Sequence, residues 1–442
     1  MSDHHKDDYS CHSSEHFQRR SFLKLGGAAG ISLLSPVASA LARIHDDRPI
    51  ATAKSLIVLW LEGAPSQLET FDPHPGTEIA AGSKARKTKA RDVLIGDGFE
   101  QVAEQMDSIS LIRAVTSKEG DHARAIYNIK TGYRPDPTII HPSIGSVICH
   151  QSNSDSKVVD IPRHISILPG GFPGRGGYLG DSFDAFKIGD PKNPVPDVQS
   201  LVDRKRQKQR INDLGFVDEK FLARHDRNSA KRKKLKPFNL DAALTMMSSE
   251  QLDAFNVSNE SESLRKEFGD TPFGRGCLAA IRLIQAGVRC IEVTLSGWDS
   301  HVNNHELQAG RIKILDPAFA ALVRELKRRE LLDSTMVLCG GEFGRTPYLN
   351  AVGGRDHWPQ GFSVALGGGG IQGGRVIGET NSKPKRDSDN RLEDLNDSRP
   401  VEDIHATILK AMGIQFNHEL ESPIGRPMKI SQGKPIERLL ES

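Results

Sequence analysis

The feature that most constrains this fold is a set of short, continuous apolar runs. The first is Ser55–Leu61 (SLIVLWL), and three similar runs follow it: Val288–Leu295, Thr335–Cys339 and Phe362–Leu366. Strands near the centre of a parallel sheet are covered on both faces and therefore read as unbroken apolar runs. The four runs therefore predict inner strands of a parallel sheet.

Helical patterns lie between some of these runs. Arg275–Ala286 precedes the second run and places three apolar residues on one face at i, i+4 and i+7: Cys277, Ile281 and Ile284. Asp316–Leu331 precedes the third run, with an apolar face opposite a Lys/Arg-rich face: Phe319, Leu322 and Leu326. Alternation of strands and helices predicts a mostly parallel sheet flanked by helices.

The composition agrees with a soluble globular protein. The chain has 442 residues, of which 37% are hydrophobic, and its 59 basic and 57 acidic residues give a net charge of +2. This balance disfavours disorder. It also disfavours a general nucleic-acid binder, which needs a basic excess. The length allows one large α/β domain or two to three smaller ones.

The N-terminus has the form of an export signal. Gln18–Lys24 (QRRSFLK) contains a twin-arginine pair, Leu25–Val37 is a short apolar stretch, and Ala38–Ala40 is a small-x-small cleavage site. A membrane anchor or a chance Arg-Arg pair is the alternative. A stable span needs about 20 apolar residues, so the mature chain is expected to have none. We expect residues 1–40 to be removed after passage through the twin-arginine (Tat) machinery, leaving residues 41–442 in the periplasm or outside the cell. Such cargo crosses already folded and often acquires a metal first.

Four cysteines remain after that cleavage, and no CxxC pair occurs among them: Cys149, Cys277, Cys290 and Cys339. Because Cys290 and Cys339 lie in apolar runs, buried free thiols are favoured. A disulfide is the alternative outside the cytoplasm.

Two stretches resemble insertions. Residues 201–236 hold 13 basic and 5 acidic residues, including Lys231–Lys234, whereas the rest of the mature chain has 42 basic and 48 acidic residues. A solvated helical excursion is favoured there, and a patch that binds polyanions is the alternative. Residues 382–399 contain few apolar residues and predict a surface loop.

Acidic and imidazole side chains recur next to the predicted strands. They are Glu62, Glu69 and Asp72 after the first run, Asp299, His301 and His305 after the second, Glu342 and Arg345 after the third, and Asp356 and His357 before the fourth. In open α/β sheets ligands bind at the carboxyl ends of the strands. Carboxylates and imidazoles without thiolates suit Zn²⁺, Mn²⁺, Mg²⁺ or Ca²⁺. Arg345 could clamp a phosphate or sulfate oxygen. The alternatives are a helix cap, an ion pair between Glu342 and Arg345, a turn at Asp356–His357, and a surface position for His305.

The motifs LEGAPSQLETFDP, HARAIYNIKTG, SGWDSH, GEFGRTP and GRDHW together resemble a bacterial family of Tat-exported, sulfatase-like proteins, domain of unknown function 1501. The resemblance runs from about Ser55 to Gly413. This family belongs to the alkaline phosphatase-like superfamily, so the resemblance implies a three-layer α/β/α sandwich with metal-dependent hydrolase ancestry. Val401–Gly413 resembles the helix that follows the sulfatase core.

The resemblance also assigns individual residues. The superfamily's first metal-binding acid corresponds to Glu62, with Glu69 and Asp72 nearby, although the family more often has Gly at the first of these positions and Asp at the second. Its later Asp/His pair corresponds to Asp299 and His301, and its Asp-His dipeptide falls at Glu342–Phe343, which keeps the acid but not the imidazole. Its final histidine corresponds to His357, with Asp356 as an alternative ligand.

The nucleophile position departs from the sulfatase pattern. Sulfatases place a Cys or Ser, oxidised to formylglycine, nine residues before a Thr-Gly pair, and here that position is His122. His122 is a candidate ligand or acid/base, and a phosphoramidate nucleophile is a further option. It cannot become formylglycine. The remaining hydroxyl candidates are Ser66, Thr116 and Ser117.

The sequence thus predicts an exported, metal-dependent hydrolase of a phosphate or sulfate ester, either a small anionic molecule or a glycan. His122 and Arg345 are the candidate catalytic residues. The alternative is a non-catalytic binding or envelope protein on a degenerate hydrolase fold.

Overall fold

A computed structural model describes residues 53–152, 159–225, 238–385 and 391–440. The predicted export signal and Lys231–Lys234 lie outside these residues. Among the described helices, none has both the length and the apolar character needed to cross a bilayer.

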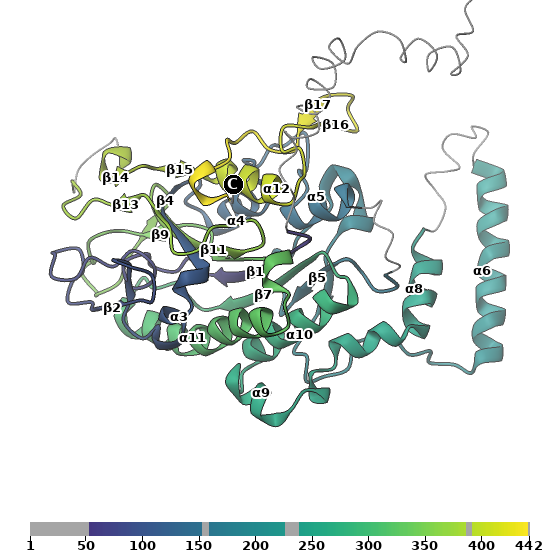
Figure 1. Ribbon diagram of the computed structural model, residues 1–442. Helices are drawn as coiled ribbons and strands as arrows, with labels where there is room; N and C mark the ends of the chain where they lie inside the picture. The colour runs from purple at the N-terminus through teal and green to yellow at the C-terminus, as the bar shows by residue number, and fades with distance from the viewer. Residues whose placement is uncertain (1–52, 153–158, 226–237, 386–390, 441–442) are drawn as a thin grey trace, which may run out of the picture. The chain divides into compact units, whose positions relative to one another are not determined.

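A nine-stranded sheet forms the centre of the fold (Figure 1). Its order is β12-β4-β11-β8-β1-β7-β5-β6, and β15 also pairs with β4. The strands are β1 (Ser55–Glu62), β4 (Ile109–Thr116), β5 (His164–Ile167), β6 (Phe186–Ile188), β7 (Cys290–Ser296), β8 (Thr335–Gly340), β11 (Phe362–Gly368), β12 (Val376–Ile377) and β15 (Arg399–Pro400). β1 lies between β7 and β8 and is parallel to both. The predicted α/β class with a mostly parallel sheet is confirmed.

The fourth apolar run is a strand, but its predicted direction was wrong. β11 is antiparallel to both of its neighbours, β8 and β4. Two parallel neighbours need a crossover connection, usually a helix. Between β8 and β11 the chain instead forms the short antiparallel pair β9 (Gly344–Arg345) and β10 (His357–Trp358) and returns from the same edge of the sheet.

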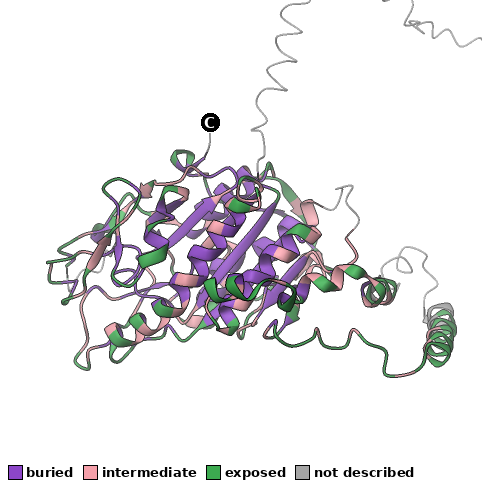
Figure 2. Cartoon of the chain, turned by 60° about the horizontal axis from the view of Figure 1, so that its bottom comes forward, coloured by how far each residue is buried: buried purple, intermediate pink, exposed green. Residues whose placement is uncertain are grey.

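Helices cover both faces of the sheet, which confirms three layers (Figure 1). Ile57, Leu59 and Leu61 of β1 pack in one cluster with α10 (Pro272–Ala286) and α11 (Asn304–Arg328). The alternate residues of β1 pack on the other face with α4 (His122–Thr131), α5 (Ile144–Gln151) and α12 (Val401–Ala411). This alternation is the side-chain period of a strand. Figure 2 shows the buried strands at the centre of the molecule.

The predicted helices form, with shifted starts. Thr271 caps α10 through its side chain, and Gly287 ends the helix in the left-handed region. α11 begins at Asn304, 12 residues before the predicted start, and contains Pro317 in its interior. The apolar face seen in the sequence therefore belongs to the C-terminal half of a longer helix.

The four described cysteines are buried free thiols, as predicted. In the basic segment, α6 (Arg204–His225) is helical and its basic residues from Arg204 to Arg210 are exposed. The polar stretch at 382–399 is not only loop, because β14 (Leu395–Asn396) lies within it and β15 begins at its last residue, Arg399.

Candidate metal centre

The carboxyl ends of β1, β7 and β8 place polar residues at one edge of the sheet. Gly63 follows β1, Asp299 follows β7, and Glu342 follows β8. Gly63 has a φ of +107°, and a Cβ there would lie 2.7 Å from the backbone nitrogen of Asp299. Only glycine tolerates that conformation at so close an approach. Its N–H donates to Glu342 Oε1 at 2.9 Å, which joins the loop after β1 to the loop after β8.

Helix α4 delivers His122 to this edge. The Asp121 side chain caps the helix by accepting from the Arg124 N–H, and Gly132 ends it at φ +74°. His122 is therefore the first residue of a helix whose two ends are fixed. Its Nδ1 lies 2.8 Å from Glu342 Oε1, and its Nε2 lies 3.6 Å from Asp299 Oδ2.

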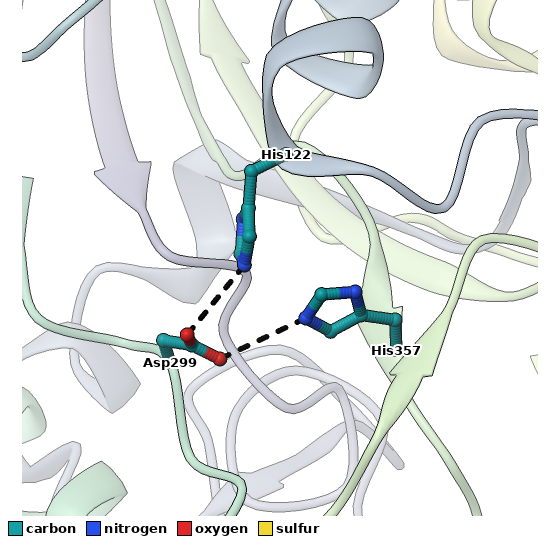
Figure 3. A group of neighbouring side chains, drawn as sticks. All are labelled: His122, Asp299 and His357. Atoms are coloured by element: carbon teal, nitrogen blue, oxygen red, sulfur yellow. Dashed lines mark ion pairs between the residues drawn. The ribbon is translucent and has the colours of Figure 1, made fainter.

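His357 reaches the same point from the β9–β10 pair. Its Nδ1 lies 2.8 Å from the Gly120 carbonyl oxygen, so this nitrogen carries the proton and Nε2 keeps its lone pair. His357 Nε2 lies 3.8 Å from Asp299 Oδ1. One ligand atom from each of His122, Asp299 and His357 lies within 4.8 Å of the others, and the three side chains point toward one another (Figure 3).

Unpaired buried atoms show that this group fits a cation. His122 Nε2 and Glu342 Oε2 are both buried and have no hydrogen-bond partner among the described residues. In the neutral ring whose Nδ1 donates to the Glu342 carboxylate, the His122 Nε2 keeps its lone pair. Two imidazole nitrogens and a carboxylate oxygen converge, each imidazole held through its other nitrogen by an oxygen acceptor, which is the usual arrangement of metal-binding histidines.

The charged surroundings set the protonation of these groups. The hydrogen bond that His122 makes to the Glu342 carboxylate raises the pKa of His122. Burial raises the pKa of Asp299, but the hydrogen bond and charge of Arg345 outweigh it and lower the pKa below its ordinary value. Burial lowers the pKa of His357. Asp299 is therefore a carboxylate and His357 a neutral imidazole near neutral pH.

His301 and Asp356 lie on the more exposed side of the group. His301 Nδ1 lies 2.8 Å from Asp356 Oδ1, and its Nε2 lies 2.9 Å from His357 Nε2 and 3.3 Å from Asp299 Oδ1. The side chains of His301 and Asp356 are 46% and 55% exposed. The structure thus brings five of the six residues predicted as ligands into one neighbourhood.

Arg345 lies beneath this group with a fully buried side chain. Its guanidinium donates to Asp299 Oδ1 at 2.6 Å and to the carbonyl oxygens of Gly63, Ala64 and Arg355. All three guanidinium nitrogens donate to protein acceptors, so Arg345 holds Asp299 and the loop after β1 in place.

Glu62, the sixth predicted ligand, points elsewhere. Its carboxylate accepts from Ser296 Oγ at 2.6 Å and from the Gly171 N–H at 3.2 Å. Glu69 and His305 form a separate pair, with His305 Nδ1 at 3.1 Å from Glu69 Oε1, and Arg355 lies 2.9 Å from the same oxygen. Asp72 is buried and accepts from the Thr380 N–H.

Two of the three hydroxyl candidates are buried or hydrogen-bonded, and the third, Thr116, is the half-buried last residue of β4. Ser66 is fully buried, and Ser117 Oγ donates to Asn128. The sequence analysis did not identify two backbone groups that take part in the site. The Gly63 N–H orients Glu342, and the Gly120 carbonyl oxygen orients His357. A glycine directly after a strand was the available signal for Gly63.

Known proteins resemble this chain in sequence, through a protein family, and in fold, through solved structures. Residues 53–440 match the family model "Protein of unknown function (DUF1501)". No match was found among curated protein sequences.

Solved structures with a similar fold include a protein in the alkaline phosphatase superfamily from Vibrio parahaemolyticus, at 14% identity and a TM-score of 0.38 over 88% of this chain and 71% of that one. A lipoteichoic acid synthase from Listeria monocytogenes matches at 10% identity and a TM-score of 0.40 over 88% and 77% of the two chains. A sulfatase from Pseudoalteromonas sp. matches at 11% identity and a TM-score of 0.37, over 86% of this chain and 71% of that one. The family match covers nearly all of the described residues, and the chain therefore belongs to the DUF1501 family.

Proposed function

We propose that this protein is an exported, metal-dependent hydrolase that cleaves a phosphate or sulfate ester. One observation carries the proposal: His122, Asp299 and His357 converge at the carboxyl ends of the strands, with the unpaired Nε2 of His122 facing the others. Two imidazoles and one carboxylate favour Zn²⁺ over Mn²⁺, Mg²⁺ and Ca²⁺, which prefer oxygen ligands.

With three protein ligands, a bound ion would keep a coordination position for a substrate. Catalytic metal sites use three protein ligands and keep a further position open. A divalent ion bound there supplies Lewis acidity, which stabilises the negative charge that develops on the ester oxygens. Arg345 holds the Asp299 carboxylate, and Glu342 holds the His122 ring, so both donors are oriented before a ligand arrives.

His301 supplies the proton to the leaving group in this proposal. Its Nδ1 is fixed by Asp356, so its Nε2 points at Asp299 and His357 from the exposed side of the site. A general acid must lie within hydrogen-bond reach of the leaving oxygen. The predicted ligand pair His301 and Asp356 thus becomes a proton donor and its orienting carboxylate. Water is the attacking nucleophile in this proposal, because His122 is used as a ligand and Ser66 is buried. The oxygen of water bonds to phosphorus or sulfur as the bond to the leaving oxygen breaks, the leaving oxygen takes the proton of His301, and the proton lost by water passes to solvent.

Metal content and turnover test this function together. We expect the purified full chain to hold about one divalent ion and to hydrolyse 4-nitrophenyl phosphate or 4-nitrophenyl sulfate. Asp299→Asn and His357→Gln should lose the ion and at least about 100-fold in kcat/KM, since even changes to residues that support the ligands cost 10–100-fold. His305→Gln is the matched control and should retain both. Absence of bound metal and of turnover after incubation with Zn²⁺, Mn²⁺, Mg²⁺ or Ca²⁺ would overturn the proposal.

A second candidate function is binding without catalysis. The observation that favours it is His122 at the position where sulfatases carry their nucleophile. Under this alternative the protein holds a metal and binds vanadate or phosphate, yet leaves both aryl esters intact. Export is tested separately: in a host lacking the Tat translocase, the chain should stay in the cytoplasm with residues 1–40 uncleaved.

A further inference from the structure

Helix α6 is a large surface element that takes no part in the metal centre. It has 22 residues, and none of those whose side chains are described is buried. Most helices in proteins are stabilised by packing one face against the core. Because α6 buries no face among the described residues, its side chains are available to a partner outside the chain.

The first two turns of α6 carry five exposed cations: Arg204, Lys205, Arg206, Lys208 and Arg210. None of them makes an ion pair with a described residue. The first turn also has no acidic residue, although the positive end of the helix dipole favours acids and disfavours cations there. These cations therefore weaken the start of the helix, and their charge is free for an anionic partner.

The charge of this segment is opposite to that of the rest of the chain. Residues 201–236 hold 13 basic and 5 acidic residues, whereas the rest of residues 41–442 holds 42 basic and 48 acidic residues. An anionic surface attracts the first part and repels the second. The α6 segment is therefore the part of the molecule that such a surface selects.

Apolar side chains are exposed next to these cations. Nine large apolar side chains are exposed among the described residues, and four of the nine lie within residues 201–217: Leu201, Leu214, Phe216 and Val217. Leu201 is 97% exposed and Phe216 is 61% exposed. A soluble polyanion has no apolar part to cover these side chains, whereas the boundary between the headgroups and acyl chains of a bilayer does.

An apolar groove runs between α6 and α8 (Phe238–Ser248). Its volume is about 640 Å³. Six of its lining residues are apolar: Leu201, Ile211, Leu214, Val217, Leu240 and Met247. Arg210 lines the same groove. An apolar groove with a cation at its edge suits a molecule that joins an acyl chain to an anionic headgroup.

We propose that α6 and this groove dock the protein on the surface of an anionic phospholipid bilayer. The cations bind phosphate headgroups, and the apolar side chains beside them enter the boundary between headgroups and acyl chains. The attachment is peripheral. It does not depend on the proposed hydrolase, because no residue that lines the groove belongs to the metal centre.

Co-sedimentation with lipid vesicles tests this surface. The form to test is residues 41–442, the mature chain expected after signal cleavage, which contains every described residue and lacks the apolar stretch Leu25–Val37. It should bind vesicles that contain phosphatidylglycerol and should not bind pure phosphatidylcholine vesicles. Binding should weaken when NaCl rises from about 0.1 M to about 1 M, which shortens the Debye length from about 10 Å to about 3 Å.

Replacing three cations of α6 measures the contribution of charge. Each cation near an anionic bilayer strengthens binding about fivefold, so the variant Arg204→Gln/Lys205→Gln/Arg206→Gln should bind about 100-fold more weakly. These side chains are exposed, so the urea midpoint and the helical circular dichroism of the variant should match those of the wild type.

The matched control removes the same net charge from exposed lysines elsewhere: Lys87→Gln/Lys187→Gln/Lys313→Gln. It should bind within about threefold of the wild type, because charges further than a Debye length from the bilayer are screened. Comparison of the two triple variants separates the position of the cations from the net charge of the protein.

Val217→Ser measures the apolar contribution, and Val352→Ser is its matched control. Both valine side chains are 59% exposed, but only Val217 lines the groove. Val217→Ser should therefore weaken binding to phosphatidylglycerol vesicles about fivefold. Val352→Ser should bind as the wild type does.

Four results would overturn the proposal. The first two are no binding to phosphatidylglycerol vesicles, and equal binding by the two triple variants. Binding to polyphosphate as tight as to vesicles, with Val217→Ser unchanged, would assign the cations to a soluble polyanion. A dimer in light scattering that Val217→Ser abolishes, without vesicle binding, would assign the groove to a second copy of the chain.

Discussion

At the scale of single residues, the site depends on buried charges that only tertiary contacts can satisfy. The side chains of Arg345, Arg355 and Glu342 are fully buried. The sequence analysis assigned Arg345 to clamping an anion. An isolated arginine next to a strand end is equally suited to binding a ligand or holding a loop, so the sequence alone does not distinguish these two roles. The contacts that decide between these roles come from Gly63 and Asp299, far away along the chain.

Arg345→Gln tests that positioning role. The change leaves Asp299 without its cation and several backbone carbonyl groups without their donor. We expect a loss of about 3 kcal/mol in the free energy of unfolding, measured by urea titration. Arg311→Gln is the matched control, since its guanidinium contacts only the Ser296 carbonyl oxygen at 3.3 Å among the contacts described, and it should cost less than about 1 kcal/mol. Equal losses in the two variants would contradict the role given to Arg345.

A second prediction concerns the pair formed by His305 and Glu69. The hydrogen bond with Glu69 raises the pKa of His305 above its usual 6.5. Burial raises the pKa of Glu69, but His305 and Arg355 lower it in net to about 2. The contribution of the His305 charge to the free energy of unfolding is therefore complete below pH 6.5 and is lost as the pH rises through the folded pKa of His305. The contribution of the Glu69 charge is lost only as the pH falls from 4.5 through about 2.

The variant His305→Gln should thus destabilise the protein more at pH 6 than at pH 9. Because His305 is 41% exposed, we expect a difference below about 1 kcal/mol. Urea unfolding of both proteins at the two pH values measures it. The same loss at both pH values would show that the charge of His305 does not contribute.

At the scale of secondary-structure elements, helix α4 matters most because its first residue, His122, is delivered to the metal centre. Its ends were predictable from sequence, since Asp121 and Gly132 are strong cap residues. What the sequence could not provide is the helix's contact partner. Gly132 packs against the ring of His405 in α12, so that a Cβ at position 132 would meet the ring at 3.1 Å.

Two glycine substitutions therefore have opposite expected effects. Gly132→Ala forces a side chain into the left-handed region against His405 and should destabilise by about 1–2 kcal/mol. Gly310→Ala lies inside α11, where an added Cβ meets nothing within 4 Å, and should stabilise by about 0.5–1 kcal/mol. Thermal unfolding followed by circular dichroism distinguishes them. Stabilisation by both would show that the end of α4 is not constrained as described.

The strands show which elements of the sheet an apolar sequence pattern predicts and which it does not. β1, β7 and β8 could be predicted because their side chains are apolar on both faces. β4 was missed because it contains Arg113 and Ser110, which are paired through distant contacts: Arg113 donates to the Phe71 carbonyl oxygen, and Ser110 to that of Gln372. β5 has only four residues, including His164. The reversed direction of β11 depends on the β9–β10 pair, which is too short to leave an apolar pattern.

At the scale of the whole molecule, the small net charge of the sequence results from unlike parts. The 13 basic and 5 acidic residues of 201–236 offset the 42 basic and 48 acidic residues in the rest of residues 41–442. Asp299, Glu342 and Asp356 lie at one edge of the sheet, which suits that edge to a cation. The sequence predicted this edge, because the carboxyl ends of parallel strands coincide. It could not predict that Glu62 points away while Gly63 takes part, since neighbouring residues at the end of β1 face different partners.

The central claim is that His122, Asp299 and His357 together hold a divalent ion. Anomalous diffraction from crystals of the full chain soaked in Zn²⁺ tests it most directly. The account predicts one strong peak at about 2.0–2.2 Å from His122 Nε2, from an Asp299 carboxylate oxygen and from His357 Nε2, which is absent in Asp299→Asn crystals. A wild-type crystal without a peak at these three residues, or with zinc bound only elsewhere, would contradict it.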